Sequence, residues 1–512
     1  MNRILRTVFL ILILCVTAGM ACKKSAGNDY RMTEIRVDKT MLDLKPGESM
    51  QLRATAVPAV ASQPNYQWTS ANTAVATVTN GLVKALAAGE TTVTVAASGI
   101  TTIINVKVSL VPPVTNVYDD TVLKLTLRGA DCPFAEYADY GIYIPTRTEQ
   151  LRGVLVLQHG CGMEQFGITK TYDLQYRAFA RKWKLAVIET ALYGNCGGWR
   201  SPESGSGPAL IKVLQQTATA TSHNELNTVP WLLWGHSGGG HWTLGMLRAY
   251  PERILAAVCY SPAFDPQWEY PAAVSKVPVL TRHAGKNDGN DGGVLCQATS
   301  INAFRKLRDL DAPVSIALNE SQNHNLSYIR YMAIPFYEAA MKQRLPATAG
   351  GVMKDLDRSQ AWLGDTLTLQ IYQESSYTGD KKGLCLLPDE ASAKAWKEYY
   401  QTGTVEDKTA PPAPFNLKLT RQGENVELSW SADADIESGI KQFEIYKDGT
   451  LLGRVPESGN YQYFDLNGDN TITPAVAPMK YVFNGAANAA IAVRTINHFN
   501  LPSAKTEIQY TK

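Results

Sequence analysis

Hydrophobic and polar positions follow three patterns along the chain. Residues 31–111 and 415–511 alternate apolar and polar side chains in short runs, which turn-forming pairs such as Pro46-Gly47 separate. Short, evenly spaced alternating runs predict antiparallel strands with one buried face, so a β-sandwich is expected near each end. The region between them alternates continuous apolar runs with helical spacing, which predicts a mostly parallel sheet with helices on both faces.

The apolar runs of the central region are expected to form strands buried on both faces of the sheet. They cover residues 153–157, 185–188, 231–234, 254–259, 277–280 and 314–318. Helical spacing is found at residues 172–183, 208–217, 298–307 and 326–343. An extension at 346–408 is predicted to contain a strand at 366–372 and a helix at 389–400, with Pro388 in the first turn of that helix.

Residues 1–21 have the pattern of an export signal: a basic start, a short apolar run and small residues directly before Cys22. The run is too short to span a bilayer comfortably, so we expect its removal. A cysteine in this place resembles the bacterial lipoprotein signal, which implies a lipid on Cys22, membrane anchorage and a polar tether over residues 22–30. A plain secretory signal is the alternative, and both interpretations export the protein.

Charge and cysteine content narrow the possible partners. The chain has 49 Lys and Arg against 47 Asp and Glu, and loss of Arg3 and Arg6 with the signal lowers the net charge from +2 to 0. A nucleic-acid partner is therefore not expected. Beside Cys15 and Cys22, six cysteines remain, an even number that permits disulfides after export. Their spacing is not that of a zinc site, and no metal or cofactor is expected.

Four short motifs follow one another in the first β-rich segment. They are YQWTS at 66–70, VATV at 75–78, NGLV at 80–83 and AGETTVTV at 88–95. In this order they resemble the group 2 bacterial immunoglobulin-like domain, which we place at residues 31–113. The resemblance implies a spacer or adhesive module rather than a catalytic domain.

The second β-rich segment, residues 415–512, follows a proline-rich linker at 409–414. Its apolar runs resemble strands of a fibronectin type III domain, with Trp430 as the core tryptophan. Within it, DLNGD at 465–469 resembles the start of a calcium loop. Glycine is missing at the sixth position of that loop and the bidentate carboxylate at the last, so a polar hairpin turn is expected instead.

The stretch 229–240 reads VPWLLWGHSGGG and is followed at once by helical spacing over 241–250. An apolar run, a glycine-rich turn and a helix give G-x-S-x-G the strand–turn–helix context that this motif requires. Ser237 is then expected at the apex of a sharp turn, with its hydroxyl exposed as a nucleophile. An ordinary glycine-rich connection is the alternative.

The order of strands and helices over residues 118–345 resembles an α/β-hydrolase. In that family an acid and then a histidine follow the serine along the chain. Asp288 comes directly after one predicted strand, and His324 comes after the last, so they are the expected acid and base. Asp265 and Asp291 are alternative acids, and a solvated loop histidine is the alternative interpretation of His324.

The stretch QHGCGM at 158–163 resembles the oxyanion-hole loop of the same family. The resemblance implies that the amide of Gly238 and that of Cys161 or Gly162 would bind the oxyanion. A tight structural turn is the alternative.

The next predicted loop carries Trp199 and Arg200, which are expected to line the acyl or alcohol pocket. Trp242 and Trp268 are weaker candidates, and packing in the core is the alternative for each tryptophan.

Cys196 of the same loop and Cys161 follow strands that would be neighbours in the hydrolase fold. We therefore expect a disulfide that braces the oxyanion loop.

Together these resemblances imply an exported, lipid-anchored serine hydrolase that cleaves carboxylic esters through an acyl-enzyme. Its expected location is the outer membrane, cell surface or periplasm, and its β-rich ends favour an acylated polysaccharide as substrate. Two alternatives stay open. One is a non-catalytic glycan-binding or adhesion protein on a hydrolase scaffold, and the other is a serine peptidase or acyltransferase.

Overall fold

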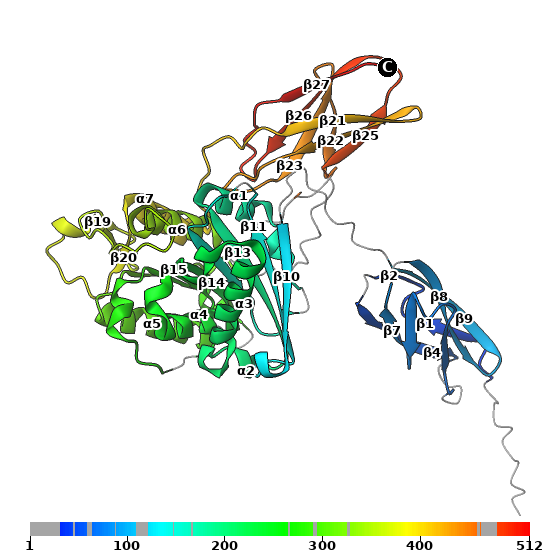
Figure 1. Ribbon diagram of the computed structural model, residues 1–512, viewed down its shortest axis with the longest axis horizontal. Coiled ribbons are helices and arrows are strands. Elements are labelled where there is room, and N and C mark those ends of the chain that lie inside the picture. Colours follow the sequence, from blue (N-terminus) through cyan, green and yellow to red (C-terminus); the bar gives the residue numbers. More distant parts are fainter. Residues whose placement is uncertain are drawn as a thin grey trace, which may run out of the picture. The chain divides into compact units, whose positions relative to one another are not determined.

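The computed structural model divides the chain into two compact units, Met1–Pro113 and Val114–Lys512, which are described separately (Figure 1). The described residues are 31–44, 47–58, 64–87, 89–108, 121–146, 148–164, 167–264, 267–289, 294–324, 328–457, 461 and 479–512. The expected signal segment and Cys22 lie outside them. No helix within these ranges is long and apolar enough to cross a bilayer.

The first unit contains three small sheets. One pairs β1 (Glu34–Val37) with β4 (Ala54–Val57); the second has the order β2 (Met41–Leu44), β9 (Ile100–Val108), β8 (Gly89–Ala97), β5 (Gln67–Ser70); the third has the order β3 (Ser49–Gln51), β7 (Leu82–Ala85), β6 (Ala76–Thr79). Alternate residues of these strands, such as Val93 and Ile104, face one buried apolar core. The predicted β-sandwich is confirmed.

The second unit is built on an eight-stranded sheet. Its order is β10 (Thr121–Arg128), β11 (Tyr137–Ile144), β13 (Leu185–Tyr193), β12 (Gly153–Gln158), β14 (Trp231–His236), β15 (Ile254–Tyr260), β16 (Val279–His283), β17 (Val314–Leu318). The pairs β10–β11 and β11–β13 are antiparallel, and all later pairs are parallel. This crossover order is that of the α/β-hydrolase fold, so the expected fold class is confirmed.

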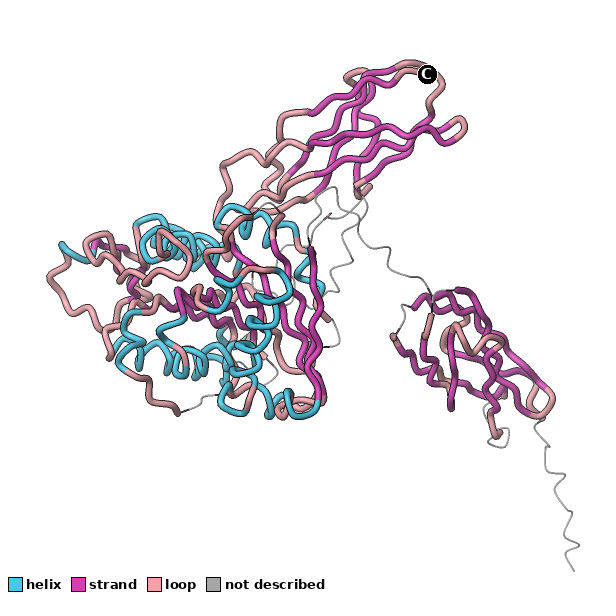
Figure 2. Tube along the Cα trace, viewed as in Figure 1, coloured by secondary structure: helices cyan, strands magenta, loops and turns pink. Residues whose placement is uncertain are grey.

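The helices of the described chain all belong to this central part, as the cyan segments of Figure 2 show. They are α1 (Leu174–Trp183), α2 (Cys196–Trp199), α3 (Ser206–Thr221), α4 (Gly238–Ala249), α5 (Val294–Asp309), α6 (Arg330–Arg344) and α7 (Glu390–Thr402). Helices that connect parallel strands cover the sheet faces, which explains why the central strands are continuously apolar.

The extension packs against the last strand of the sheet. It forms β18 (Trp362–Gly364), β19 (Ile371–Gln373), β20 (Cys385–Leu387) and α7. The indole nitrogen of Trp396 on α7 donates to the carbonyl of Ile316 on β17 at 2.8 Å. This hydrogen bond joins the extension to the strand that precedes the expected catalytic histidine.

Two predictions for the extension are wrong. The strand expected at 366–372 is formed only at residues 371 and 372, which belong to β19. Residues 366–368 are a turn instead, because the carboxylate of Asp365 accepts the amide of Leu367 at 2.8 Å and the Thr368 hydroxyl at 2.8 Å. Pro388 does not lie in the first turn of α7. Asp389 is the N-cap instead and forms a capping box with Ser392.

The C-terminal segment forms a sandwich of two sheets. Their orders are β21 (Phe415–Gln422), β22 (Asn425–Ser431), β25 (Lys480–Asn484), and β24 (Thr450–Val455), β23 (Gln442–Lys447), β26 (Ala489–Ile496), β27 (Thr506–Tyr510). Trp430 is buried between the two sheets, and its ring centre lies 5.2 Å from that of Phe443, so its core position is confirmed.

The sandwich packs on the hydrolase part, because Leu174 and Ala178 of α1 belong to the same apolar core. The fibronectin type III resemblance stays a prediction, and residues 465–470 lie outside the described ranges.

A buried polar cluster joins the end of the extension to this sandwich. The side-chain amide of Asn497 donates to Asp407 at 2.9 Å and to Asp435 at 3.1 Å, and the Ser438 hydroxyl donates to Asp407 at 2.6 Å. Burial, contact with Glu437 and the charge of Asp407 raise the pKa of Asp435 well above its usual range, against the effect of Asn497. Asp435 therefore keeps its proton in the folded protein at pH values where a free aspartate has lost it.

This proton predicts how the stability of the second unit depends on pH. A raised carboxyl pKa in the folded state means that stability falls as pH rises from the ordinary aspartate pKa toward the folded-state pKa. Asp435→Asn keeps a neutral side chain, so its advantage in melting temperature over the wild type should be larger at about pH 8 than at about pH 5. The control is Asp433→Asn, because Asp433 is a nearby, partly exposed aspartate that pairs with Arg181. Equal melting-temperature differences at the two pH values would contradict the prediction.

Candidate active site

Ser237 occupies the sharp turn between β14 and α4. Its backbone has φ 54° and ψ −117°, a sparsely populated combination for a residue with a side chain. Three hydrogen bonds hold it: its N–H donates to Tyr260 at 3.1 Å, and its carbonyl accepts from His241 at 3.1 Å and from Ala263 at 3.2 Å. The structure thus places Ser237 where the motif predicts a nucleophile.

The glycines of the motif are required by close backbone contacts. A Cβ atom on Gly239 would lie 2.5 Å from the carbonyl oxygens of Gln158 and His159. A Cβ atom on Gly235 would overlap the backbone of Gly239. Any larger residue would push the turn away from the loop after β12, so these glycines keep Ser237 beside that loop.

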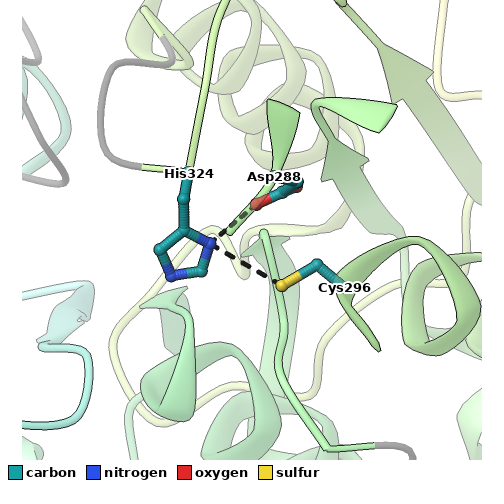
Figure 3. A group of neighbouring side chains, drawn as sticks. All are labelled: Asp288, Cys296 and His324. Carbon is teal, nitrogen blue, oxygen red and sulfur yellow. Dashed lines mark hydrogen bonds and ion pairs between the residues drawn. The ribbon is translucent and has the colours of Figure 1, made fainter. Parts of the chain in front are cut away.

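His324 and Asp288 meet at the carboxyl edge of the sheet. The Nδ1 atom of His324 lies 2.7 Å from Oδ1 of Asp288, whose side chain is fully buried (Figure 3). Of the three acids considered from the sequence, Asp288 is the one that the described residues bring to His324. Asp265 and Asp291 lie outside the described ranges.

The buried carboxylate of Asp288 stays ionised. Burial alone would raise its pKa, but the hydrogen bond with His324, the charge of Arg282 and the amide of Ala284 outweigh burial and lower the pKa to about 2. The second carboxylate oxygen accepts the Ala284 amide at 2.7 Å and the Ser261 hydroxyl at 2.9 Å. Asp288 is therefore a fixed anion that can hold the N–H of a histidine.

Two residues that sequence reasoning missed complete this network. Arg282, fully buried on β16, donates to the Ser261 hydroxyl at 2.8 Å, and that hydroxyl donates in turn to Asp288. Ser261 follows β15 with φ 45°, a conformation that points to a special local role. Ser261 directly follows β15, and Arg282 is the second-last residue of β16. Nothing in the sequence around them distinguishes them from other residues near strand ends.

His324 lies next to the residue that precedes the serine. His236 Nε2 is 2.9 Å from the carbonyl of His324, and the two rings are 4.8 Å apart. Burial and the nearby His324 lower the pKa of His236 well below its usual value, so the neutral ring donates this hydrogen bond. Within the described ranges, no direct hydrogen bond joins the Ser237 hydroxyl to His324. Such catalytic hydrogen bonds are often long before a substrate binds.

The loop after β12 is covalently tied to the loop after β13. Cys161 and Cys196 form a disulfide with Cα atoms 5.3 Å apart, as expected from the fold resemblance. A Cβ atom on Gly238 would lie 2.9 Å from the sulfur of Cys196, so the bond packs directly on the first residue of α4. The disulfide thereby holds this loop against the serine turn.

His159 fixes the same loop from inside. Its Nδ1 lies 2.6 Å from the carbonyl of Gly160, and its Nε2 accepts the amide of Leu192 at 2.8 Å. Burial is the main reason that the pKa of His159 falls to about 4, so the ring is neutral with its proton on Nδ1. Nothing in the sequence around His159 predicts this role.

Three backbone N–H groups near the serine have no backbone acceptor within the described chain. They belong to Cys161, Gly162 and Gly238, and Gly238 starts α4, where helical N–H groups have no intrahelical partner. The amide nitrogen of Cys161 would be 3.3 Å from a Cβ atom on Gly238. Unpaired donors from two loops therefore come together beside Ser237.

The two predicted pocket residues differ in exposure. Trp199 is 0 % exposed and packs edge-on against His159 at 4.9 Å, so it offers no surface to a substrate and supports the loop after β12. Arg200 is partly exposed, and its guanidinium lies 3.7 Å from the centre of the Phe264 ring. No ion pair involves Arg200 within the described ranges.

The extension supports the loop that carries His324. Gln322 donates to the carbonyl of Gly403 at 2.8 Å and accepts the Tyr399 hydroxyl at 3.0 Å. It also accepts from Arg282 at 3.1 Å. The histidine loop is therefore held between β16 and the C-terminal end of α7.

Cys296 at the start of α5 adds a third polar atom next to His324. Its sulfur lies 3.6 Å from His324 Nδ1, and one ligand atom each from Asp288, Cys296 and His324 lie within 4.8 Å of one another (Figure 3). The side chain of Cys296 is only 4 % exposed. Nothing in the sequence around Cys296 predicts that it lies beside His324.

One family model matches part of the first unit. Residues 31–101 match the model of the bacterial Ig-like domain (group 2). No curated protein sequence matches the chain.

Part of the chain is similar to three solved structures: an α/β-hydrolase enzyme from a Medee basin deep-sea metagenome library, a thermostable esterase, and an S-formylglutathione hydrolase from Staphylococcus aureus. Their sequence identities are 16%, 13% and 14%, and their TM-scores 0.31, 0.31 and 0.29. The matches cover 41%, 46% and 41% of this chain and 85%, 65% and 91% of the other chains.

The disulfide should contribute measurably to stability. It closes a loop with a sequence separation of 35, for which the chain-entropy model gives about 4 kcal/mol. Urea denaturation of the Cys161→Ala/Cys196→Ala double variant should show a loss of this size, whereas Cys132→Ala lacks the loop-closure term. Unchanged stability of the double variant, or both cysteine peptides found unlinked in a non-reducing digest, would rule out the cross-link.

Proposed function

We propose that the protein is a serine hydrolase that cleaves carboxylic esters through an acyl-enzyme. The observation that carries this proposal is the 2.7 Å contact between His324 and the buried anion Asp288, beside a serine in a strained turn. A hydrogen-bonded acid and histidine at the sheet edge, next to unpaired amides, is what acyl transfer requires.

In the proposed mechanism Asp288 holds the Nδ1 proton of His324, which leaves the Nε2 lone pair available for the serine. His324 takes the hydroxyl proton as Ser237 attacks the ester carbon, and the amides of Gly238 and of Cys161 or Gly162 bind the oxyanion. The protonated histidine then protonates the departing alcohol. Water attacks the acyl-enzyme by the same route in reverse, and Ser237 is restored.

The substrate side of the proposal rests on Arg200. A partly exposed guanidinium stacked on Phe264, close after the Cys196 loop, can bind an oxygen-rich or anionic group of the substrate. We also propose export, a lipid on Cys22 and an acylated polysaccharide as substrate, with the immunoglobulin-like domain as a spacer. We also propose the domain bounds within the second unit: a hydrolase domain at 118–345, its extension at 346–408, a linker at 409–414 and a fibronectin type III-like domain at 415–512.

Two other functions use the same fold. A non-catalytic surface protein would not need an ionised acid paired with a histidine at a strained serine, and these features therefore favour an enzyme. A serine peptidase or acyltransferase would share the nucleophile, so substrate assays rather than the site geometry distinguish it from an esterase.

Loss of the nucleophile is the first test. Ser237→Ala should lower kcat for a p-nitrophenyl ester by at least about a thousandfold, because only the oxyanion donors and binding remain. The variant should also lose labelling by a fluorophosphonate probe while keeping the wild-type circular dichroism spectrum. The control Ser359→Ala changes an exposed serine of the extension. Full activity of Ser237→Ala would refute the nucleophile, and wild-type protein without labelling or turnover would favour the binding-protein alternative.

The role of Arg200 predicts a selective effect. Arg200→Gln should lower kcat/KM about tenfold for an ester with a carboxylate next to the scissile bond, because a hydrogen bond to a charged group is lost. The value for a neutral ester of the same size should change little. The matched control is Arg248→Gln, since Arg248 is paired with Glu203 at 2.7 Å. Equal losses on both esters would contradict an anion-binding role.

A further inference from the structure

The acid–histidine pair has a neighbour that the proposed ester hydrolysis does not use. The thiol of Cys296 lies 3.6 Å from His324 Nδ1, the same nitrogen that contacts Asp288 (Figure 3). It also donates to the carbonyl of Ser261 at 3.4 Å. A carboxylate, an imidazole and a thiol therefore converge on one point, and they come from three separate segments of the chain.

These three groups are ligands that zinc prefers, and the distance between the sulfur and the nitrogen is close to what zinc needs. Tetrahedral zinc with Zn–S about 2.3 Å and Zn–N about 2.0–2.1 Å sets the sulfur and nitrogen about 3.6 Å apart. The observed distance between Cys296 Sγ and His324 Nδ1 is 3.6 Å. The carboxylate oxygen of Asp288 lies 2.7 Å from Nδ1. It would have to move about 0.6 Å farther from Nδ1 to reach the nitrogen–oxygen distance of a zinc tetrahedron.

We propose that Asp288, Cys296 and His324 form an inhibitory site for zinc or a similar thiophilic divalent cation. A metal on Nδ1 replaces the proton that now faces Asp288, and the imidazole then carries its proton on Nε2. Nε2 can no longer accept the proton of Ser237, so the metal-bound protein is inactive. The inhibition rests on the proposed function, whereas metal binding does not.

The charges of the site also suit a divalent cation. The Asp288 carboxylate is ionised, with a pKa of about 2, and metal binding would ionise the thiol of Cys296 as well. Two anions balance the charge of the metal, although Arg282 reaches Asp288 through Ser261 and weakens the attraction. The proton balance is specific: the imidazole keeps one proton and the thiol loses one.

Binding can be measured without turnover. In the full chain with the Ser237→Ala substitution, zinc titration in a weak buffer should release about one proton per ion bound, and Co²⁺ should give a thiolate charge-transfer absorption band. Cys296→Ser and Cys296→Ala in the same background should lose the band and the proton release. The control Cys132→Ser removes another buried thiol and should keep both. Identical signals in all these variants would overturn the proposed site.

Inhibition is tested separately in the wild type. Zinc should inhibit hydrolysis of a p-nitrophenyl ester with half-inhibition on the order of 1–10 µM, and excess chelator should restore the rate. Each Cys296 variant, compared with its own metal-free rate, should need at least about tenfold more zinc. Equal sensitivity of the variants and the wild type would place the inhibiting ion elsewhere. A metal signal in a protein without esterase activity would refute the proposed function and leave the metal site standing.

Discussion

The fully buried carboxylate of Asp288 is the constraint on which the candidate active site depends. A charge without solvent contact is tolerated only where hydrogen bonds and opposite charge replace water. Here the Ala284 amide, the Ser261 hydroxyl and His324 surround it, and Arg282 supplies the compensating charge. The strand order of the sheet brings these groups together, because β15, β16 and β17 are consecutive neighbours whose carboxyl ends meet at one edge.

The same network explains why the site needs parts of the chain that look peripheral. Gln322 connects Arg282 to Tyr399 and Gly403 of the extension, so the histidine loop is held from outside the hydrolase fold proper. The C-terminal sandwich shares its apolar core with α1, which follows the loop that carries the unpaired amides. The second unit is therefore one structural body, to which the extension and the C-terminal sandwich both belong.

Much of the central fold and the serine turn could be predicted from the sequence, because the sequence patterns that indicate them are local. The serine turn has a strand before it and a helix after it. The predicted apolar strands of the central sheet end at most five residues before the observed ones, and the prediction for β17 matches completely. The antiparallel strands β10 and β11 were not singled out, because their patterns are weaker than those of the fully buried parallel strands. The turn at Asp365 was missed because a single carboxylate decides its backbone conformation.

What the sequence could not supply are contacts between distant segments. Ser261, Arg282 and Cys296 carry no motif, and their roles follow only from the groups that the fold brings beside them. Trp199 was expected at the pocket, but the position after a strand does not say which way an indole turns, and this one packs against His159. Whether a tryptophan lines a pocket or packs in the core depends on its burial in the fold, which its residue type does not determine.

The disulfide between Cys161 and Cys196 has a consequence for when the protein matures. Thiols pair stably only in oxidising surroundings and stay reduced in the cytosol of most cells. A newly made chain in a reducing compartment would thus have its strands and helices but lack the brace on the loop behind Gly238. The redox state of its destination, rather than synthesis itself, would then complete the architecture around the serine.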